Sequence, residues 1–223
     1  MNTKKHIVIY SHGFGVRKDD NGLLSDIAEN LPELESVLFD YYDLDEVNNE
    51  LLICPPSQQV NKLNKTIQEL RIKNPEAIID LIAHSQGVVA AAMAKPSGIR
   101  KAVLLAPVFD MGLEGTLSRY RAKPGAELNI NGTSRIPSST GFIRVIPKEY
   151  WQERLAIKTF QEYNSFSEKT EIIAIEAKQD ELLPKIDLQA LSKKIKIISL
   201  DGDHGFHAPN REGLIKTIRE LLL

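Results

Sequence analysis

Cysteine and long apolar runs are the features that this sequence most clearly lacks. Cys54 is the only cysteine among 223 residues, so the chain can form neither a disulfide framework nor a thiolate metal cluster. It precedes Pro55 and Pro56, and we expect it in a loop. No stretch approaches the roughly 18 apolar residues of a membrane helix, and the run Ile7–Tyr10 is too short for a signal peptide. We therefore expect a cytoplasmic protein without a membrane span.

An excess of charge of one sign is also missing. The chain has 28 lysines and arginines against 30 aspartates and glutamates, a formal net charge of -2. This balance predicts no electrostatic attraction to nucleic acid or to anionic membranes. The sequence has no internal repeat or low-complexity tract, and no histidines and carboxylates share the spacing of a metal site.

The stretch Ala77–Ala94 carries the strongest signal that is present. It begins with the β-branched apolar run Ile78–Ile82, which predicts a buried strand, and ends with small aliphatic residues that suit a tightly packed helix. The five residues AHSQG between them leave no room for an ordinary loop. Such a sharp turn strains its middle residue, Ser85, and requires small neighbours, here Ala83 and Gly87. This is the pattern of a nucleophile elbow, G-x-S-x-G, with alanine in the first place.

Strands and helices alternate along most of the chain, which predicts an α/β domain with a mostly parallel sheet and helices on both faces. The apolar runs predict strands at residues 6–10, 36–41, 78–82, 99–105, 171–177 and 195–200. The helical spacing predicts helices over residues 23–31, after a cap at Ser57, over 88–94, over 188–193 and over 211–223.

Residues 110–167 differ from the rest because they show no strand rhythm and are rich in glycine and proline. Their one good helix candidate is Lys148–Tyr163. We interpret this segment as an insertion over one face of the core and call it the cap. The core is then formed by residues 1–109 and 168–223.

The predicted strand ends carry the groups of an acyl-transfer site, because function gathers at the carboxyl ends of parallel strands. Ser85 offers a hydroxyl nucleophile, and His204 offers an imidazole that can take its proton and later return it. Asp180 offers a carboxylate that orients His204. Two backbone N–H groups are needed to bind the oxyanion, and we assign them to Gln86 and Phe14.

Other residues compete for these roles. His207 is the rival of His204, but it falls beside the start of the last helix rather than in the loop after the strand. Asp201 and Asp203 compete with Asp180, although they precede the histidine too closely to reach round to its ring. Two further histidines neighbour the site. We interpret His12 as structural and expect His84 to point away from Ser85.

With these motifs in place, the chain resembles the α/β-hydrolase superfamily, in its compact esterase and serine-peptidase-like branch. The resemblance rests on HGFG, on AHSQG, on Asp180 after a strand and on GDHGF, and it covers nearly the whole chain except residues 110–167. Ala83 departs from the usual glycine. The resemblance implies a serine hydrolase without a cofactor that works through an acyl-enzyme.

The leading functional hypothesis is hydrolysis of small to medium carboxylic esters, as in a carboxylesterase. Amide, peptide or thioester hydrolysis would use the same triad and stays open. A different class also stays open, because an α/β-hydrolase fold can serve as a non-catalytic ligand-binding protein. The expected partner is a small-molecule ester or amide, and the sequence does not indicate an oligomeric state.

The cap is expected to shape the substrate pocket. Its apolar residues would be stranded in a solvated loop but could line a concave site if folded back; they are Met111, Leu113, Leu117, Phe142, Ile143, Tyr150 and Trp151. The segment also contains the basic residues Arg119, Arg121, Lys123, Arg135 and Arg144. Two interpretations remain open for these cations: they are solvated, or one of them meets a carboxylate on an acidic substrate.

Overall fold

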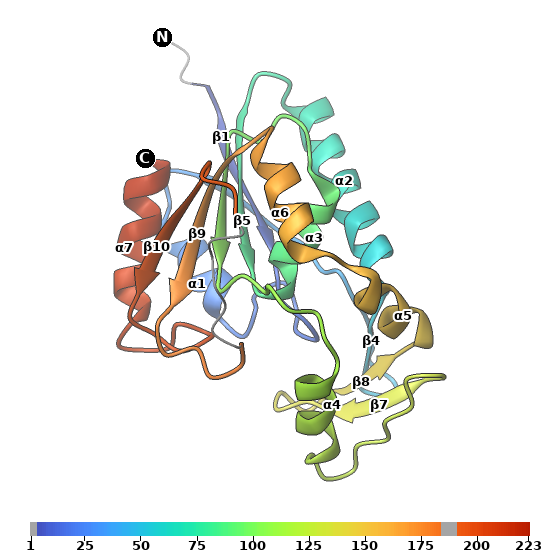
Figure 1. Ribbon diagram of the computed structural model, residues 1–223. Helices are drawn as coiled ribbons and strands as arrows, with labels where there is room; N and C mark the ends of the chain where they lie inside the picture. Colours follow the sequence, from blue (N-terminus) through green and yellow to red (C-terminus); the bar gives the residue numbers. More distant parts are fainter. Residues whose placement is uncertain (1–3, 184–190) are drawn as a thin grey trace.

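A parallel six-stranded sheet forms the centre of the molecule (Figure 1). The computed structural model describes residues 4–183 and 191–223. The strand order is β10-β9-β6-β5-β1-β2, and every pairing in this central sheet is parallel. The strands are β1 His6–Ser11, β2 Glu35–Leu38, β5 Ile78–His84, β6 Lys101–Leu105, β9 Glu171–Ala177 and β10 Ile195–Leu200.

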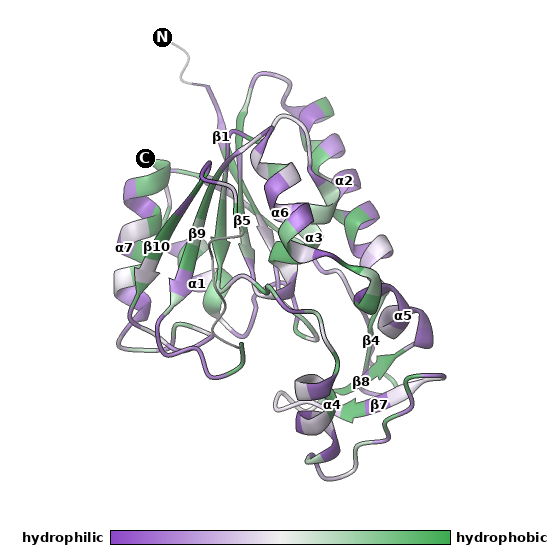
Figure 2. Cartoon of the chain, viewed as in Figure 1, coloured by the Kyte–Doolittle hydropathy of each residue, from purple (hydrophilic) through white to green (hydrophobic). Residues whose placement is uncertain are grey.

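Helices cover both faces of this sheet, as the alternation of elements predicts. Alternate residues of the central strands are buried in two separate cores, because successive side chains of a strand point to opposite faces. One core is closed by α2 Pro56–Lys73, α3 Gln86–Ala94 and α6 Thr159–Ser167; the other is closed by α1 Leu23–Glu29 and α7 Arg211–Leu222. Figure 2 shows the central strands as the most hydrophobic part of the chain.

Two local predictions about the core are wrong. The predicted strand 36–41 ends at Leu38, because the backbone N–H of Tyr41 donates to His12 Nε2 (2.9 Å) instead of joining the sheet. Ser57 is not the cap of α2. Pro55 is the N-cap and Pro56 fills the first turn, where its missing N–H costs nothing. Ser57 instead donates from its backbone N–H and its hydroxyl to the carboxylate of Glu153, at 2.8 Å each.

A second, smaller sheet was not predicted. Its order is β3-β4-β8-β7, and we call it the small sheet: β3 Asp43–Asp45, β4 Glu50–Leu52, β7 Ser134–Pro137 and β8 Ile143–Ile146. Two of its strands therefore come from the cap, which corrects the expectation that residues 110–167 contain no strands. With α4 Glu114–Arg121, the small sheet lies beyond the carboxyl ends of the central strands (Figure 1).

The single helix expected over Lys148–Tyr163 is two helices, α5 Lys148–Ala156 and α6. The chain becomes extended at Ile157 (φ -74°, ψ 125°) and changes direction, which lets α6 pack against α3. The Tyr163 hydroxyl then donates to the Val108 carbonyl at 2.5 Å, and Phe166 is fully buried in the core. The cap segment thus returns to the central sheet before it ends.

Three further expectations concern Cys54, the helix over 188–193 and a membrane span. Cys54 lies in the loop between β4 and α2, buried, and burial raises the pKa of its thiol to about 11. Of the helix expected over 188–193, residues 188–190 lie outside the described residues, and 191–193 are not helical. None of the helices in the described ranges is long and apolar enough to cross a membrane.

Candidate active site

A sharp turn at Ser85 joins β5 to α3, at the place where the stretch Ala77–Ala94 predicts a nucleophile elbow. Ser85 has φ 52° and ψ -120°, a strained conformation for a residue with a side chain. A Cβ at Gly87 would lie only 2.3 Å from the Ser11 carbonyl oxygen, so this position accepts no side chain. The Ser11 hydroxyl donates to the Gly87 carbonyl (2.9 Å). The turn is therefore held from β1 as well as from β5.

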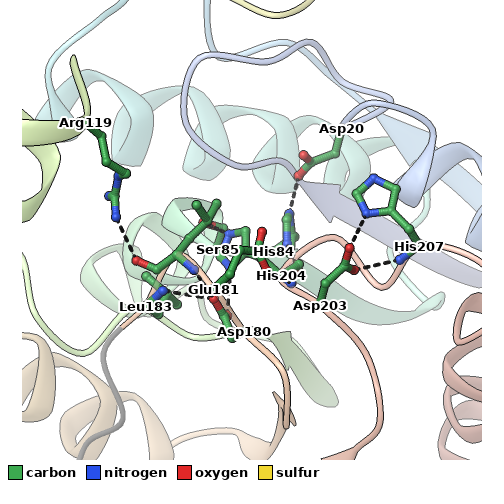
Figure 3. Close-up of polar contacts among 11 residues, drawn as sticks. Asp20, His84, Ser85, Arg119, Asp180, Glu181, Leu183, Asp203, His204 and His207 are labelled. Carbon is green, nitrogen blue, oxygen red and sulfur yellow. Dashed lines mark hydrogen bonds and ion pairs between the residues drawn. The ribbon is translucent and has the colours of Figure 1, made fainter. Parts of the chain in front are cut away.

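Ser85, His204 and Asp180 meet at the carboxyl ends of the central strands (Figure 3). His204 Nε2 lies 2.9 Å from Ser85 Oγ, and His204 Nδ1 lies 2.8 Å from Asp180 Oδ2. Because a carboxylate only accepts, Nδ1 carries the proton and Nε2 is left to accept from the serine hydroxyl. The arrangement predicted from the sequence is present, and it can activate a hydroxyl for attack.

Asp180 is held in place by more than the histidine. Its Oδ1 accepts the backbone N–H groups of Leu182 and Leu183, both at 2.9 Å. Burial raises the pKa of Asp180, but the hydrogen bonds from His204 and from these two amides outweigh burial and hold it below its usual range. Glu181 adds to the frame by accepting the backbone N–H of His204 at 3.1 Å.

The competing residues are engaged elsewhere. His207 is exposed and pairs with Asp203, which accepts both from its ring Nδ1 (2.8 Å) and from its backbone N–H (2.9 Å). Asp201 forms an ion pair with Lys178 at 3.3 Å. The geometry therefore places His204 and Asp180 beside Ser85 and leaves His207 and Asp203 outside the arrangement (Figure 3). Asp201 is also outside it, in its ion pair with Lys178.

The backbone of the glycine-flanked turn after β1 lies next to the elbow. A Cβ built on Gly13 would be 3.4 Å from the Ser85 Cβ, so the two turns are in contact. Within the described residues, no protein acceptor is seen for the backbone N–H of Phe14 or for that of Gln86. These two groups remain free to bind an oxyanion, although their role is a prediction.

His12 supports this turn, as expected for a structural residue. Its Nδ1 lies 2.9 Å from the Gly13 carbonyl oxygen, and its Nε2 accepts the N–H of Tyr41. Only the neutral tautomer protonated at Nδ1 satisfies both contacts. Burial, the largest effect, lowers the pKa of His12 despite the nearby Asp20, so the neutral form is favoured.

His84 and Asp20 form a buried pair behind the triad that the sequence analysis did not identify. His84 Nδ1 lies 2.8 Å from Asp20 Oδ2, and His84 Nε2 lies 3.0 Å from the His204 carbonyl oxygen. Asp20 Oδ2 also accepts the backbone N–H of Gly13 at 2.7 Å. One ion pair therefore links the turn after β1, the elbow and the loop that carries His204 (Figure 3).

The prediction that His84 points away from Ser85 is consistent with these contacts. Its partner was missed because Asp20 lies 64 residues earlier, in a loop without periodicity. A weak signal existed. Asp20, Asn21 and Gly22 all have positive φ, a conformation in which aspartate, asparagine and glycine are enriched. The sequence Asp-Asn-Gly thus indicated a tight turn that returns the carboxylate toward the glycine-flanked loop.

Aromatic residues of the cap contact the site. The Phe14 ring packs against Tyr150, with ring centroids 5.0 Å apart, and against Tyr120 at 6.5 Å. The Tyr150 hydroxyl donates to Gln86 Oε1 at 2.7 Å, in the residue after Ser85. Trp151 follows in α5, and its ring meets Tyr150 edge-on. The cap is therefore joined to both predicted oxyanion positions.

Two further features lie outside the triad. In the described residues, no group of three or more histidine, cysteine, aspartate or glutamate side chains could hold a metal ion. A cavity of about 500 Å³ lies at the base of the cap, between residues 109–112 and 155–161, and no triad residue lines it. We assign no role to this cavity.

Comparisons with known proteins place the fold but not the family. No family model matches the chain, and no curated protein matches it. Among solved structures, Est1E from Butyrivibrio proteoclasticus is similar with a TM-score of 0.68 at 17% identity, covering 99% of this chain and 88% of that chain.

Two other esterase structures agree. The esterase domain of a Rhodothermus marinus protein has a TM-score of 0.65 at 16% identity, covering 99% of this chain and 87% of that chain. The Pyrococcus furiosus esterase PF2001 has a TM-score of 0.65 at 14% identity, covering 99% and 81%. At these identities the similarity shows a shared fold across almost the whole chain.

Proposed function

We propose that this chain, which has the α/β-hydrolase fold, is a serine hydrolase of small to medium carboxylic esters. The observation that carries the proposal is the continuous contact from Asp180 through His204 to Ser85, at 2.8 and 2.9 Å, on a strained elbow. The esterase names of the similar structures support the ester class.

The proposed reaction has two halves. His204 Nε2 takes the hydroxyl proton as Ser85 Oγ attacks the ester carbonyl, and the N–H groups of Phe14 and Gln86 bind the oxyanion. The imidazolium, stabilised by Asp180, then returns the proton to the leaving alcohol, and an acyl-enzyme remains. Water, deprotonated by His204, repeats the attack and releases the acid and the free serine.

The other expectations stay predictions. Residues 110–167 are proposed to act as a cap over the site, supported by the contacts of Tyr150 and Phe14 beside the nucleophile. Amide and thioester hydrolysis use the same atoms and are alternatives within this mechanism. A ligand-binding protein without turnover is the alternative from another class. Cytoplasmic location also stays a prediction.

The proposal is tested by Ser85→Ala, with Ser199→Ala as a matched control on the exposed side of β10. Wild type and Ser199→Ala should hydrolyse 4-nitrophenyl butyrate and be labelled by a fluorophosphonate. Ser85→Ala should lose on the order of a thousandfold in kcat/KM and all labelling. An unlabelled but ligand-binding wild type would support the binding protein instead.

A further inference from the structure

Arg144 occupies an unusual position, on the inner face of the small sheet. Along β8, Arg144 shares a face with Ile146, which is fully buried in the core. Its register partners are Leu51 on β4 and Ile136 on β7, and both are fully buried. A guanidinium thus stands where the sheet otherwise places aliphatic side chains.

Within residues 4–183 and 191–223, one hydrogen bond of the Arg144 guanidinium to the protein is seen. Its Nε donates to the Gly15 carbonyl oxygen at 2.9 Å. Among the described residues, no carboxylate pairs with it, and no acceptor is seen for its two terminal nitrogens. Nη1 and Nη2 therefore have unused N–H donors, and the side chain is partly exposed, so that a ligand can approach them.

Two other arginines of the cap have protein partners for their guanidinium groups. Arg135 lies one strand away and forms an ion pair with Glu50. Arg154 is buried without a carboxylate, but its Nε, Nη1 and Nη2 all donate to protein oxygens. Among the described residues, Arg144 has neither an ion pair nor hydrogen bonds from all three of its nitrogens.

The electrostatic surroundings of Arg144 are unfavourable for a cation. Burial lowers the pKa of Arg144, and the neighbouring tyrosines Tyr120 and Tyr42 offset this only in part. Lys123 is close enough that its own pKa is lowered, first by burial and then by Arg144. Two cations thus share one partly dry region, and a bound anion would relieve both the lost hydration and their repulsion.

This region adjoins the nucleophile. A Cβ at Gly15 would come within 2.4 Å of Arg144 Nε, so the absence of a side chain there lets the guanidinium approach the turn. Gly13, two residues earlier, touches Ser85, and two residues span at most about 7 Å. Arg144 therefore lies within about 15 Å of Ser85, so a substrate of medium length can reach from one to the other.

We propose that Arg144 binds a carboxylate on the substrate, so that the preferred esters are acidic ones. This inference rests on the proposed hydrolase function. A planar carboxylate matches the two parallel N–H groups of the open guanidinium edge, which a neutral ester group cannot engage as strongly. Among the basic residues of the cap, the structure thus singles out Arg144.

The kinetic test compares two matched ester pairs. Mono-4-nitrophenyl adipate carries a carboxylate on its acyl group, and 4-nitrophenyl hexanoate is its neutral counterpart. On the alcohol side, 4-acetoxybenzoate carries a carboxylate, and 4-acetoxybenzamide is its neutral counterpart. In at least one pair, wild type should favour the anion, and Arg144→Gln should reduce that preference about ten- to hundredfold in kcat/KM. The ratio within a pair is the readout, because loss of the hydrogen bond from Arg144 to Gly15 acts on the charged and the neutral ester alike.

Two variants control for side effects. Arg144→Lys should keep part of the preference, because it retains the charge but not the fork. Arg135→Gln, in the same sheet, should keep all of it. Equal preferences in wild type and Arg144→Gln for both pairs would overturn the proposal while leaving ester hydrolysis intact.

A binding measurement makes the result independent of turnover. Adipamate, a carboxylate that is not an ester, and neutral adipamide are titrated calorimetrically into each variant at low ionic strength. Wild type should bind adipamate at least tenfold more tightly, and Arg144→Gln should lose the difference. If no ester is turned over but this difference is found, the hydrolase proposal fails and the anion site stands. If wild type binds both probes equally, the anion site fails.

Discussion

His204 with Asp180 and His84 with Asp20 are two histidine–aspartate pairs whose imidazole rings lie 5.0 Å apart, centroid to centroid. In both, Nδ1 lies 2.8 Å from a carboxylate oxygen. They differ at the other nitrogen. Nε2 of His204 faces the Ser85 hydroxyl, which can donate or accept, whereas Nε2 of His84 faces a carbonyl oxygen, which only accepts.

Because their Nε2 partners differ, the two imidazole rings carry different charges. His84 must donate from both nitrogens, so it is an imidazolium in a buried ion pair. Burial, the largest effect, lowers the pKa of His84, but the Asp20 charge and hydrogen bonds outweigh burial and raise it. His204 can lose and regain its Nε2 proton against the serine. The partner of Nε2, rather than the aspartate, therefore distinguishes the proposed general base, His204, from the buried cation, His84.

Removing the ring that faces the serine should have the largest effect on activity. His204→Ala should lower kcat/KM on a 4-nitrophenyl ester by on the order of a thousandfold, because the general base is lost. The fold should persist, as measured by circular dichroism. His207→Ala is the matched control, since that histidine is exposed and paired with Asp203, and it should stay within about twofold of wild type. The reverse result would transfer the base to His207.

Changing the aspartate of the same pair should have the next largest effect. Asp180→Asn lets the amide donate to His204 Nδ1, which favours the tautomer that carries its proton on Nε2. That ring cannot accept from Ser85, and kcat should fall by on the order of a hundredfold or more. Stopped assays at several pH values measure this. A variant with full activity would show that Asp180 does not orient His204.

The same substitution in the buried pair should act mainly on stability. Asp20→Asn leaves His84 as a buried cation without a counter-ion, which should cost about 3 kcal/mol or more of unfolding free energy. Urea denaturation measures this loss. Asp203→Asn, in the exposed pair with His207, is the matched control and should change stability by less than about 1 kcal/mol. Equal losses in the two variants would contradict a special role for burial.

The smallest effect should be a pH dependence of the unfolding free energy that Asp20→Asn loses. The pKa of His84 is raised, so its contribution is complete below about pH 6.5 and is lost as the pH rises through its folded-state value. The pKa of Asp20 is lowered, because the His84 charge and hydrogen bonds outweigh burial, so its contribution is present above about pH 4 and is lost in stronger acid.

The stability difference between wild type and Asp20→Asn should therefore be greatest between about pH 4 and 6.5 and should shrink toward alkaline pH. Urea denaturation of both proteins across that range gives the difference directly. Because both chains share all other titrating groups, those effects largely cancel. A difference that is constant from acid to alkaline pH would show that His84 does not carry the charge.

The sequence predicted the elbow and the triad because their signals are local. Ser85 is identified by the small residues two positions away, and His204 and Asp180 follow strands that the apolar runs reveal. The Asp20–His84 pair could not be found this way, because no periodicity connects a loop aspartate to a histidine on another strand. The small sheet was missed for a related reason. Its strands have three or four residues each, too few to show alternation, and its central pair, β4 with β8, joins segments far apart in the chain.

Arg144 illustrates the same limit. The cap contains seven other lysines and arginines, and nothing in their order along the sequence distinguishes Arg144 from them. Only the register of β8 against β4 and β7 places Arg144 on the buried face of the small sheet. Arg135, by contrast, forms an ion pair with Glu50. The selection among these cations is a property of tertiary structure.

The position of the only tryptophan has a spectroscopic consequence. Trp151 lies in α5, about 1% exposed, and contacts Tyr150, whose hydroxyl donates to the side chain of Gln86 beside Ser85. Selectively excited indole emission therefore arises from one place, where the cap meets the site. Circular dichroism, in contrast, averages over the central sheet and its helices. Recording both signals through one denaturation separates the release of the cap from the loss of the sheet without introducing any label.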